Sequence, residues 1–280
     1  MPIVANAPAR LERSFGREAF GADPANYHAA RPAYPRQTWE ALAQRAGLRG
    51  GIDILEIGAG TGLATLPLLA HGPTSLIAVE PDARLAAFLS HTAEDQRLSV
   101  VAEPFEEAEL PAASFDLVVS ATAFHWLDTV PALTRIHKLL RRGGAVALIW
   151  NVFGDGSRPD PFHEATTQLF EGHRHSTSGG GSGQTPFALE SSARLDDFAA
   201  TGFAADAPEF RRWTLELDPD GVRALYATYS NVTALPAPEQ VRLLDGLSEI
   251  AARQFGGKVQ RNMTTAIYTA RRAGDAHLAA

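Results

Sequence analysis

Runs of apolar residues alternate with amphipathic segments through the first half of the chain. Apolar runs suited to buried parallel strands recur at residues 52–57, 75–80, 98–102, 115–121 and 145–150. Segments with helical spacing of apolar residues precede or separate them, at 35–46, 63–70, 83–90 and 131–140. Strands and helices that alternate through short loops form a parallel sheet with right-handed crossovers. The pattern therefore predicts an α/β fold with helices on both faces of the sheet.

The alternation breaks after Asn151. Helical spacing returns at residues 161–170, 221–229 and 239–255, and strand-like runs lie at 210–217 and 263–270. Gly143-Gly144 predicts a turn before the fifth strand, and the glycine- and serine-rich stretch 176–183 predicts a mobile loop. We expect a core domain over residues 35–151, a cap or substrate region with a sixth strand over 152–260, and a final strand within 261–272.

Composition narrows the range of functions. A net charge of -7 over 280 residues disfavours a nucleic-acid binder, which needs a basic face. The absence of cysteine excludes disulfides, zinc–thiolate sites and a cysteine nucleophile. His163, His173 and His175 are too loosely spaced to predict a metal site. Neither a signal peptide nor a membrane-spanning run is visible, so we expect a cytoplasmic protein.

A glycine-rich turn follows the first predicted strand. It reads Gly58-Ala59-Gly60-Thr61-Gly62 and opens the next predicted helix. Glycines let the backbone turn tightly and approach a ligand closely, at the carboxyl edge of the sheet where α/β folds bind ligands. A turn that serves only packing is the alternative interpretation.

Two carboxylates flank this turn and indicate the ligand. Glu80 ends the second predicted strand, where an acidic side chain can accept hydrogen bonds from a ribose diol. That geometry suits NAD as well as an adenosyl group. The spacing lacks the third glycine of a dinucleotide fingerprint, because Leu63 follows Gly62. Glu56, just ahead of the turn, would repel a pyrophosphate and suits a ligand with an ammonium and a sulfonium, such as S-adenosylmethionine.

Three further segments belong with these motifs in the sequence. They are Ser114–Ser120, Ala123–Asp128 and, near the start, Arg31–Pro35. With the glycine turn and Glu80-Pro81-Asp82, the sequence resembles the class I S-adenosylmethionine-dependent methyltransferases over residues 15–150. It is most similar to the small-molecule group that includes ubiquinone-biosynthesis and trans-aconitate methyltransferase-like proteins. The resemblance implies a Rossmann-like, seven-stranded, mostly parallel sheet whose last strand is antiparallel, with residues 1–34 folding over the cofactor site.

The resemblance also implies roles for individual residues. The turn would lie under the cofactor, Glu56 near its amino group and Glu80 on its ribose, and Arg31 could pair with the methionine carboxylate. The expected cofactor-binding residues are Tyr27, Arg31, Glu56, Gly58, Ala59, Gly60, Gly62, Glu80, Pro81, Phe105, Glu106 and Ser120. Many relatives have Gly-Asp after the third strand, and this chain has instead Glu103 and Glu106, between which the sequence does not choose.

The expected acceptor side follows the fourth strand. His125 could contact the methionyl end, order a water or act as a general base, and a structural histidine is an equal alternative. Trp126 would form a wall of the pocket, and Tyr229 could line an acceptor site. The sequence therefore predicts methyl transfer to a small-molecule nucleophile by in-line displacement, driven by proximity and orientation. The alternatives are an NAD-dependent oxidoreductase and a non-catalytic binding protein on the same scaffold.

Overall fold

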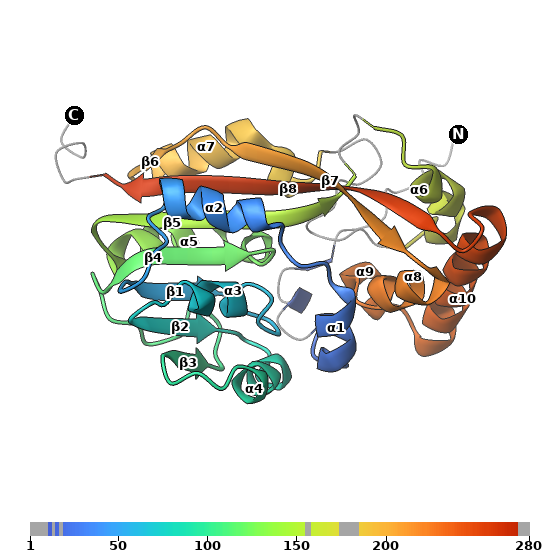
Figure 1. The fold of residues 1–280 in the computed structure, drawn as a ribbon, viewed down its shortest axis with the longest axis horizontal. Helices are drawn as coiled ribbons and strands as arrows, with labels where there is room; N and C mark the ends of the chain where they lie inside the picture. The colour runs from blue at the N-terminus through green and yellow to red at the C-terminus, as the bar shows by residue number, and fades with distance from the viewer. Residues whose placement is uncertain (1–10, 13–14, 17–18, 155–157, 174–184, 274–280) are drawn as a thin grey trace, which may run out of the picture.

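A computed structural model describes residues 11–12, 15–16, 19–154, 158–173 and 185–273. The predicted loop at 176–183 and His175 lie outside these described residues. A single mixed sheet organises the described part of the chain (Figure 1). Its strands are β1 (Asp53–Ile57), β2 (Ser75–Val79), β3 (Leu98–Val101), β4 (Phe115–Ala121), β5 (Leu140–Phe153), β6 (Phe203–Ala205), β7 (Glu209–Leu217) and β8 (Val259–Arg272).

The sheet has the order β3-β2-β1-β4-β5-β8-β6, and β7 also pairs with β8. The first five strands are parallel, whereas β8 runs antiparallel to β5. The predicted Rossmann-like sheet with an antiparallel last strand is thus confirmed. An eighth strand arises because β6 and β7 pair with successive parts of one edge of β8. Between them Asp206 accepts a hydrogen bond from the Thr269 hydroxyl at 2.7 Å, which holds the interruption against β8.

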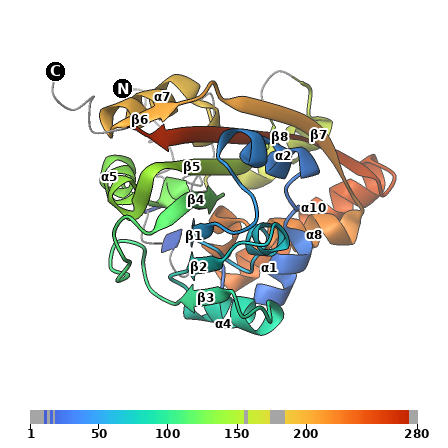
Figure 2. The ribbon, with the colours of Figure 1, turned by 60° about the vertical axis from the view of Figure 1, so that its left-hand side comes forward.

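Helices cover both faces of the sheet (Figures 1 and 2). The helices are α1 (Pro24–Ala30), α2 (Arg36–Arg45), α3 (Thr65–Ala70), α4 (Ala83–Thr92), α5 (Thr129–Leu139), α6 (Pro161–Thr166), α7 (Ser191–Ala200), α8 (Pro219–Tyr226), α9 (Ser230–Thr233) and α10 (Ala237–Gln254). Leu42 of α2, Leu68 of α3 and Leu89 of α4 enter one buried cluster with the sheet. Ile136 of α5 and Phe198 of α7 enter another cluster on the opposite face. This burial of apolar surface is the main force that holds the three layers together.

A third cluster lies beyond the sheet, where β7 and β8 extend to the right in Figure 1. Phe162 of α6, Val222 of α8 and Leu247 of α10 are buried there together with Val259 of β8. We call this cluster and its helices α6 and α8–α10 the cap. Because its core is separate from the two clusters of the sheet, the cap has its own packing and is joined to the sheet through β7 and β8.

Several element boundaries differ from the sequence predictions. The turn predicted at Gly143-Gly144 is wrong, because β5 runs through it with an irregular register opposite Phe115–Leu117. Helix α3 begins at Thr65 rather than Leu63, since the glycine turn extends further than expected. Helices α1 and α7 were not predicted from the sequence. Helix α1 begins at Asp23-Pro24, where the Asp23 side chain accepts from the Asn26 amide, and α8 starts in the same way at Asp218-Pro219.

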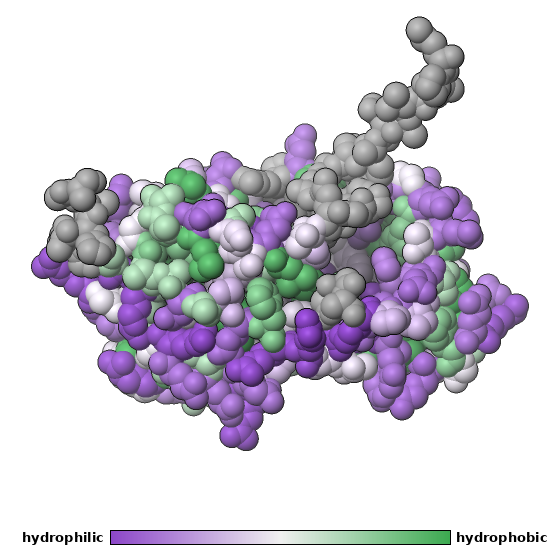
Figure 3. Space-filling model, turned by 90° about the horizontal axis from the view of Figure 1, so that it is seen from above, coloured by the Kyte–Doolittle hydropathy of each residue, from purple (hydrophilic) through white to green (hydrophobic). Residues whose placement is uncertain are grey.

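The surface in Figure 3 mixes polar and apolar residues. Among the described residues, the exposed large hydrophobic side chains are Leu66, Val130, Phe210 and Val241, which come from four separate elements. No described helix is long and apolar enough to cross a bilayer. The exposed apolar side chains are therefore scattered over the described surface and form no obvious binding patch.

Candidate active site

A cavity opens at the carboxyl ends of the parallel strands. Its lining includes Ile57 at the end of β1, Val79 at the end of β2, Ala121 at the end of β4 and Asn151 late in β5. β1 and β4 are neighbours where the strand order reverses, and α/β sheets bind ligands at this switch point. The fold thus positions the cavity where the sequence predicted a ligand site.

The glycine turn forms the floor of the cavity. Gly58 has a φ of 72°, and a Cβ built on it would lie 2.3 Å from the Cβ of Ala123. Its amide donates to the Val79 carbonyl at 2.8 Å, which ties the turn to β2. Gly60 has a φ of 57° with open space where a Cβ would stand. Backbone conformation and close approach therefore require glycine at Gly58, whereas Gly60 leaves room on the cavity side.

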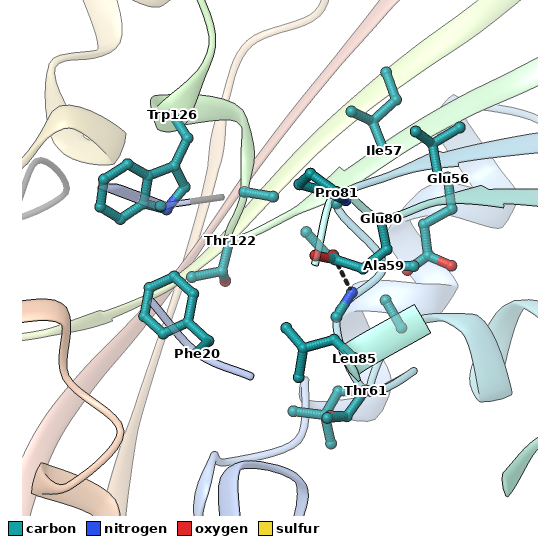
Figure 4. A pocket seen from close by; sticks show the side chains of 18 of the residues that line it. Phe20, Glu56, Ile57, Ala59, Thr61, Glu80, Pro81, Leu85, Thr122 and Trp126 are labelled. Atoms are coloured by element: carbon teal, nitrogen blue, oxygen red, sulfur yellow. Dashed lines mark hydrogen bonds between the residues drawn. The ribbon is translucent and has the colours of Figure 1, made fainter. Parts of the chain in front are cut away.

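Glu80 is held by the backbone around it. One carboxylate oxygen accepts from the Gly60 amide at 2.8 Å, the bond dashed in Figure 4, and the other accepts from the Asp82 amide at 3.0 Å. The side chain is 5% exposed, and burial raises the pKa of its carboxyl group to about 7. The two amides fix the orientation of the carboxylate, and each oxygen keeps lone-pair capacity for a ligand.

Glu56 lies beside Glu80 on the same wall (Figure 4). It accepts a hydrogen bond from the Thr65 hydroxyl at 2.6 Å and is 1% exposed. Burial, followed by the charge of Glu80, raises the pKa of the Glu56 carboxyl group to about 8. The Thr61 hydroxyl on this side is buried without a hydrogen-bond partner in the described part of the chain. We call Glu56, Glu80 and the glycine turn the acidic wall.

The opposite wall is aromatic. Phe20 and Trp126 lie across the cavity from Glu80 in Figure 4, and their rings meet edge to face with centroids 5.9 Å apart. The Phe20 ring also contacts Tyr27 at 5.5 Å. We call Phe20, Tyr27, Arg31 and Trp126 the lid wall, because three of the four come from the segment before α2.

Arg31 is the cation of the lid wall. It donates to the Thr228 carbonyl in the cap at 2.7 Å, and its guanidinium lies over the rings of Tyr27 and Tyr229, 5.2 and 5.1 Å from their centroids. Its Nε is buried and has no hydrogen-bond partner among the described residues. Arg31 therefore joins the amino-terminal segment to the cap and keeps unused donor capacity beside the cavity.

His125 does not line the cavity; it is 5% exposed behind Trp126. Its Nδ1 accepts from the Trp150 Nε1 at 3.1 Å, and an indole nitrogen can only donate. Because it accepts this hydrogen bond, the Nδ1 of His125 carries no proton. Burial and then the charge of Arg31 lower the pKa of His125 to about 3, so the ring is neutral.

Most of the predicted site residues come together around the cavity. Its lining includes Tyr27, Arg31, Glu56, Gly58, Ala59, Gly60, Glu80, Pro81, Phe105, Glu106 and Trp126. Four predicted residues lie outside the lining. Gly62 packs against Leu89, Ser120 donates to the Ile57 carbonyl at 3.0 Å, Tyr229 lies behind Arg31, and His125 lies behind Trp126.

The sequence left Glu103 and Glu106 as alternatives, and of these two Glu106 lines the cavity while Glu103 is exposed outside the lining. Sequence reasoning missed Phe20, Thr122, Asn151 and Phe153. A polar residue at the carboxyl end of a predicted strand was a usable signal for Asn151. Thr122, which has a left-handed φ of 57°, carries no such signal in the sequence.

No group of three or more histidine and carboxylate side chains in the described ranges could hold a metal ion. The predicted acidic residues of the cavity come from three different places, since Glu56 lies in β1, Glu80 follows β2 and Glu106 follows β3. The site thus consists of an acidic wall that favours positive charge, an aromatic wall and one guanidinium.

Comparison with known proteins identifies the class. Residues 55–148 match the methyltransferase domain family. An uncharacterized methyltransferase of Schizosaccharomyces pombe is 29% identical over 257 residues, which cover 89% of this chain and 95% of the relative. These matches support an S-adenosylmethionine-dependent methyltransferase.

Two solved structures share the fold. A provisionally assigned type II methyltransferase from Anaeromyxobacter dehalogenans is 23% identical with a TM-score of 0.63, and the match covers 87% of this chain and 98% of that one. Phosphoethanolamine N-methyltransferase 2 of Haemonchus contortus, solved with S-adenosylhomocysteine, is 18% identical with a TM-score of 0.53, over 91% and 58% of the two chains.

Proposed function

We propose that S-adenosylmethionine binds between the acidic wall and the lid wall, and that its methyl group is transferred there to a small apolar molecule. The observation that carries this proposal is the pair of buried carboxylates, Glu56 and Glu80, at the carboxyl ends of β1 and β2. Their raised pKa values mean that ionisation is unfavourable without a compensating positive charge. A ligand with an ammonium and a sulfonium supplies that charge.

The unused polar groups of the cavity fit this ligand. Glu80 would accept from the two ribose hydroxyls, because both of its oxygens are already aimed by backbone amides. Glu56 would lie near the methionyl ammonium, and the unpartnered Nε of Arg31 would face the carboxylate. Pro81, Phe105 and Glu106 would surround the adenine.

The bound cofactor supplies a methyl group already activated by its sulfonium. The chain itself contributes orientation and the exclusion of water. Trp126 and Phe20 close one side of the reaction space, and the glycine turn closes the floor. Alignment of an acceptor with an activated methyl group can supply much of the rate enhancement.

The acceptor would be a small apolar molecule. Phe20, Trp126, Leu127 and Phe153 give the cavity an aromatic and aliphatic side, and the acidic wall disfavours an anion there. Tyr229, which the sequence offered as an acceptor contact, would act by stacking on Arg31. A cytoplasmic location and the absence of a nucleic-acid partner remain predictions from the sequence.

We assign His125 a positioning role in place of general-base catalysis. Its Nδ1 is occupied by Trp150, and its ring packs against Trp126 with centroids 5.2 Å apart. A ring with a pKa near 3 is a weak base at neutral pH. His125 would therefore fix the angle of Trp126 in the lid wall.

Calorimetric titration tests this function. Wild-type protein should bind S-adenosylmethionine and S-adenosylhomocysteine but not NADH. Glu80→Gln should weaken binding by roughly tenfold or more, because a charged acceptor to two hydroxyls is lost. Glu103→Gln, which changes an exposed carboxylate outside the cavity, should bind like the wild type. Binding of NADH alone would favour an oxidoreductase, and binding of no nucleotide would favour a scaffold.

A further inference from the structure

A relay of three hydrogen-bonding side chains crosses the sheet and ends on the amino-terminal segment. Trp213 of β7 donates through Nε1 to the Thr265 hydroxyl of β8 at 2.9 Å. The Thr265 hydroxyl donates to the Asn151 Oδ1 of β5 at 2.7 Å. Asn151 Nδ2 donates to the carbonyl oxygens of Pro32 and Ala33, at 3.1 and 3.3 Å.

Strand register explains why these side chains meet. Asn151 and Thr265 stand directly opposite each other in the antiparallel β5–β8 pair. Trp213 stands opposite Met263, two residues from Thr265, and so projects from the same face at a diagonal position. Thr265 is fully buried between the other two side chains. The pairing of the strands therefore places the side chains of Trp213, Thr265 and Asn151 next to one another.

The direction of every bond in the relay is determined by its first member. An indole nitrogen can only donate, so the Thr265 oxygen accepts from it and must use its own hydrogen toward Asn151. The amide of Asn151 is thereby oriented with Oδ1 toward Thr265 and with Nδ2 toward the two carbonyls. Both hydrogens of Nδ2 are then available for Pro32 and Ala33.

Pro32 and Ala33 lie between Arg31, which contacts the cap, and Tyr34, which contacts the cavity wall. Arg31, the preceding residue, lies beside the cavity and binds the cap through Thr228. Tyr34, the following residue, hydrogen-bonds through its hydroxyl to Thr122 in the cavity wall at 2.7 Å. Helix α1 before them contacts α8 of the cap, where Asn26 donates to the Ala224 carbonyl at 3.1 Å. Figure 1 shows this blue helix beside α8.

We propose that Asn151, oriented by Thr265 and Trp213, is a positioning residue that fixes Pro32-Ala33 and so holds Arg31 and α1 over the bound cofactor. The proposal rests on the proposed function, because it gives Arg31 a ligand to contact. It also explains why a polar side chain stands late in β5, in the lining of the cavity. Loss of the relay would release the lid wall while leaving the acidic wall intact.

The test replaces Thr265 by Val, which preserves shape and removes the hydroxyl. Thr269→Val is the matched control, because Thr269 lies on the same strand and face, is 1% exposed, and donates a 2.7 Å bond to Asp206 away from the lid. Two quantities are measured in each folded variant: affinity for S-adenosylhomocysteine by calorimetry, and amide exchange of α1 in the ligand-free protein.

Thr265→Val should lower the affinity at least fivefold and speed exchange of the α1 amides at least fivefold, with α4 unchanged. Thr265→Ser, which keeps the hydroxyl, should restore both quantities. Trp213→Phe should have a smaller effect than Thr265→Val, since Thr265 can still donate to Asn151. Thr269→Val should change neither quantity.

Wild-type-like affinity and α1 exchange in Thr265→Val would overturn the proposal, as would equal effects from Thr269→Val. Failure of the wild type to bind either adenosyl ligand would instead contradict the proposed function. The exchange measurement in the ligand-free protein still tests the relay in that case.

Discussion

The two walls of the cavity are built in different ways. The acidic wall comes from residues 56–62 and Glu80, at the ends of two neighbouring strands, and its hydrogen bonds join residues at most 21 positions apart. The lid wall depends on contacts across the chain, such as Arg31 with Thr228, 197 positions away. Local backbone geometry thus defines the floor of the proposed cofactor site, and long-range packing decides whether the cavity is covered.

The largest expected effect comes from breaking the backbone of the acidic wall. Gly58→Ala would place a methyl group 2.3 Å from the Ala123 Cβ and force alanine to a positive φ. We expect the free energy of unfolding to fall by about 3 kcal/mol in chemical denaturation. Gly143→Ala has a similar φ of 76° with nothing within 4 Å, so it should lose only about 1 kcal/mol. Equal losses in both variants would show that close approach to Ala123 is unimportant.

The next effect comes from removing the cation of the lid wall. Arg31→Met keeps much of the side-chain volume and removes the donors that face the cavity. S-adenosylhomocysteine affinity should fall roughly tenfold or more, as expected when a charge-assisted hydrogen bond worth about 1.5–3 kcal/mol is lost. Arg36→Met serves as control, because Arg36 is exposed and pairs only with Glu40 on α2 in the described contacts. Unchanged affinity in Arg31→Met would show that the cation of the lid wall does not contribute to cofactor binding.

A smaller effect concerns the charge of the acidic wall. The pKa of Glu56 is raised from 4.5 to about 8, so the folded protein retains a proton that the unfolded chain releases. Stability of the ligand-free protein should therefore fall as pH rises through this window. Glu56→Gln removes the penalty and can still accept from Thr65. Its Tm at pH 8 should exceed that of the wild type by about 2–4 °C, equivalent to about 1 kcal/mol, with no gain near pH 4.5.

The same variant should bind S-adenosylmethionine more weakly than the wild type at pH 8, because the ammonium loses its carboxylate. A higher Tm together with lower affinity is the signature of a residue kept for binding at the expense of stability. A Tm of Glu56→Gln below that of the wild type at pH 8 would contradict the conclusion that burial of the Glu56 carboxylate destabilises the protein.

The smallest effect is expected behind the lid wall. His125→Asn keeps an acceptor where Nδ1 meets the Trp150 indole. If His125 only positions Trp126, the rate constant of methyl transfer should fall less than about tenfold, against 10²–10⁴-fold for a general base. The rate of methyl transfer should depend on pH in the same way in the wild type and in His125→Asn. A loss of a hundredfold or more would restore the base role.

The difference between the walls also explains what the sequence could predict. The spacing of Gly58, Gly60 and Glu80 follows from short-range geometry, so the acidic wall and the parallel strands could be predicted from the residues. Arg31 and Tyr27 were expected only from the resemblance to a family. Phe20 and Thr122 gave no local signal, because their place in the cavity depends on packing against distant segments.

Some features were present in the sequence and were missed. Asp23-Pro24 has the capping signature that also opens α6 and α8, and it would have predicted α1. The turn predicted at Gly143-Gly144 failed because glycine also accommodates an irregularity within a strand. Where the sheet edge is split into β6 and β7, Asp206 contacts Thr269 of β8, and no periodicity in the sequence shows this tertiary contact.

A crystal structure of the protein with S-adenosylhomocysteine would show where the cofactor binds. We expect the ribose hydroxyls within hydrogen-bond distance of Glu80, the amino group near Glu56, and the carboxylate near Arg31 beneath a closed α1. An adenosyl group bound elsewhere, or bound here with Glu80 and Arg31 turned away from it, would contradict the division of the cavity into an acidic wall and a lid wall.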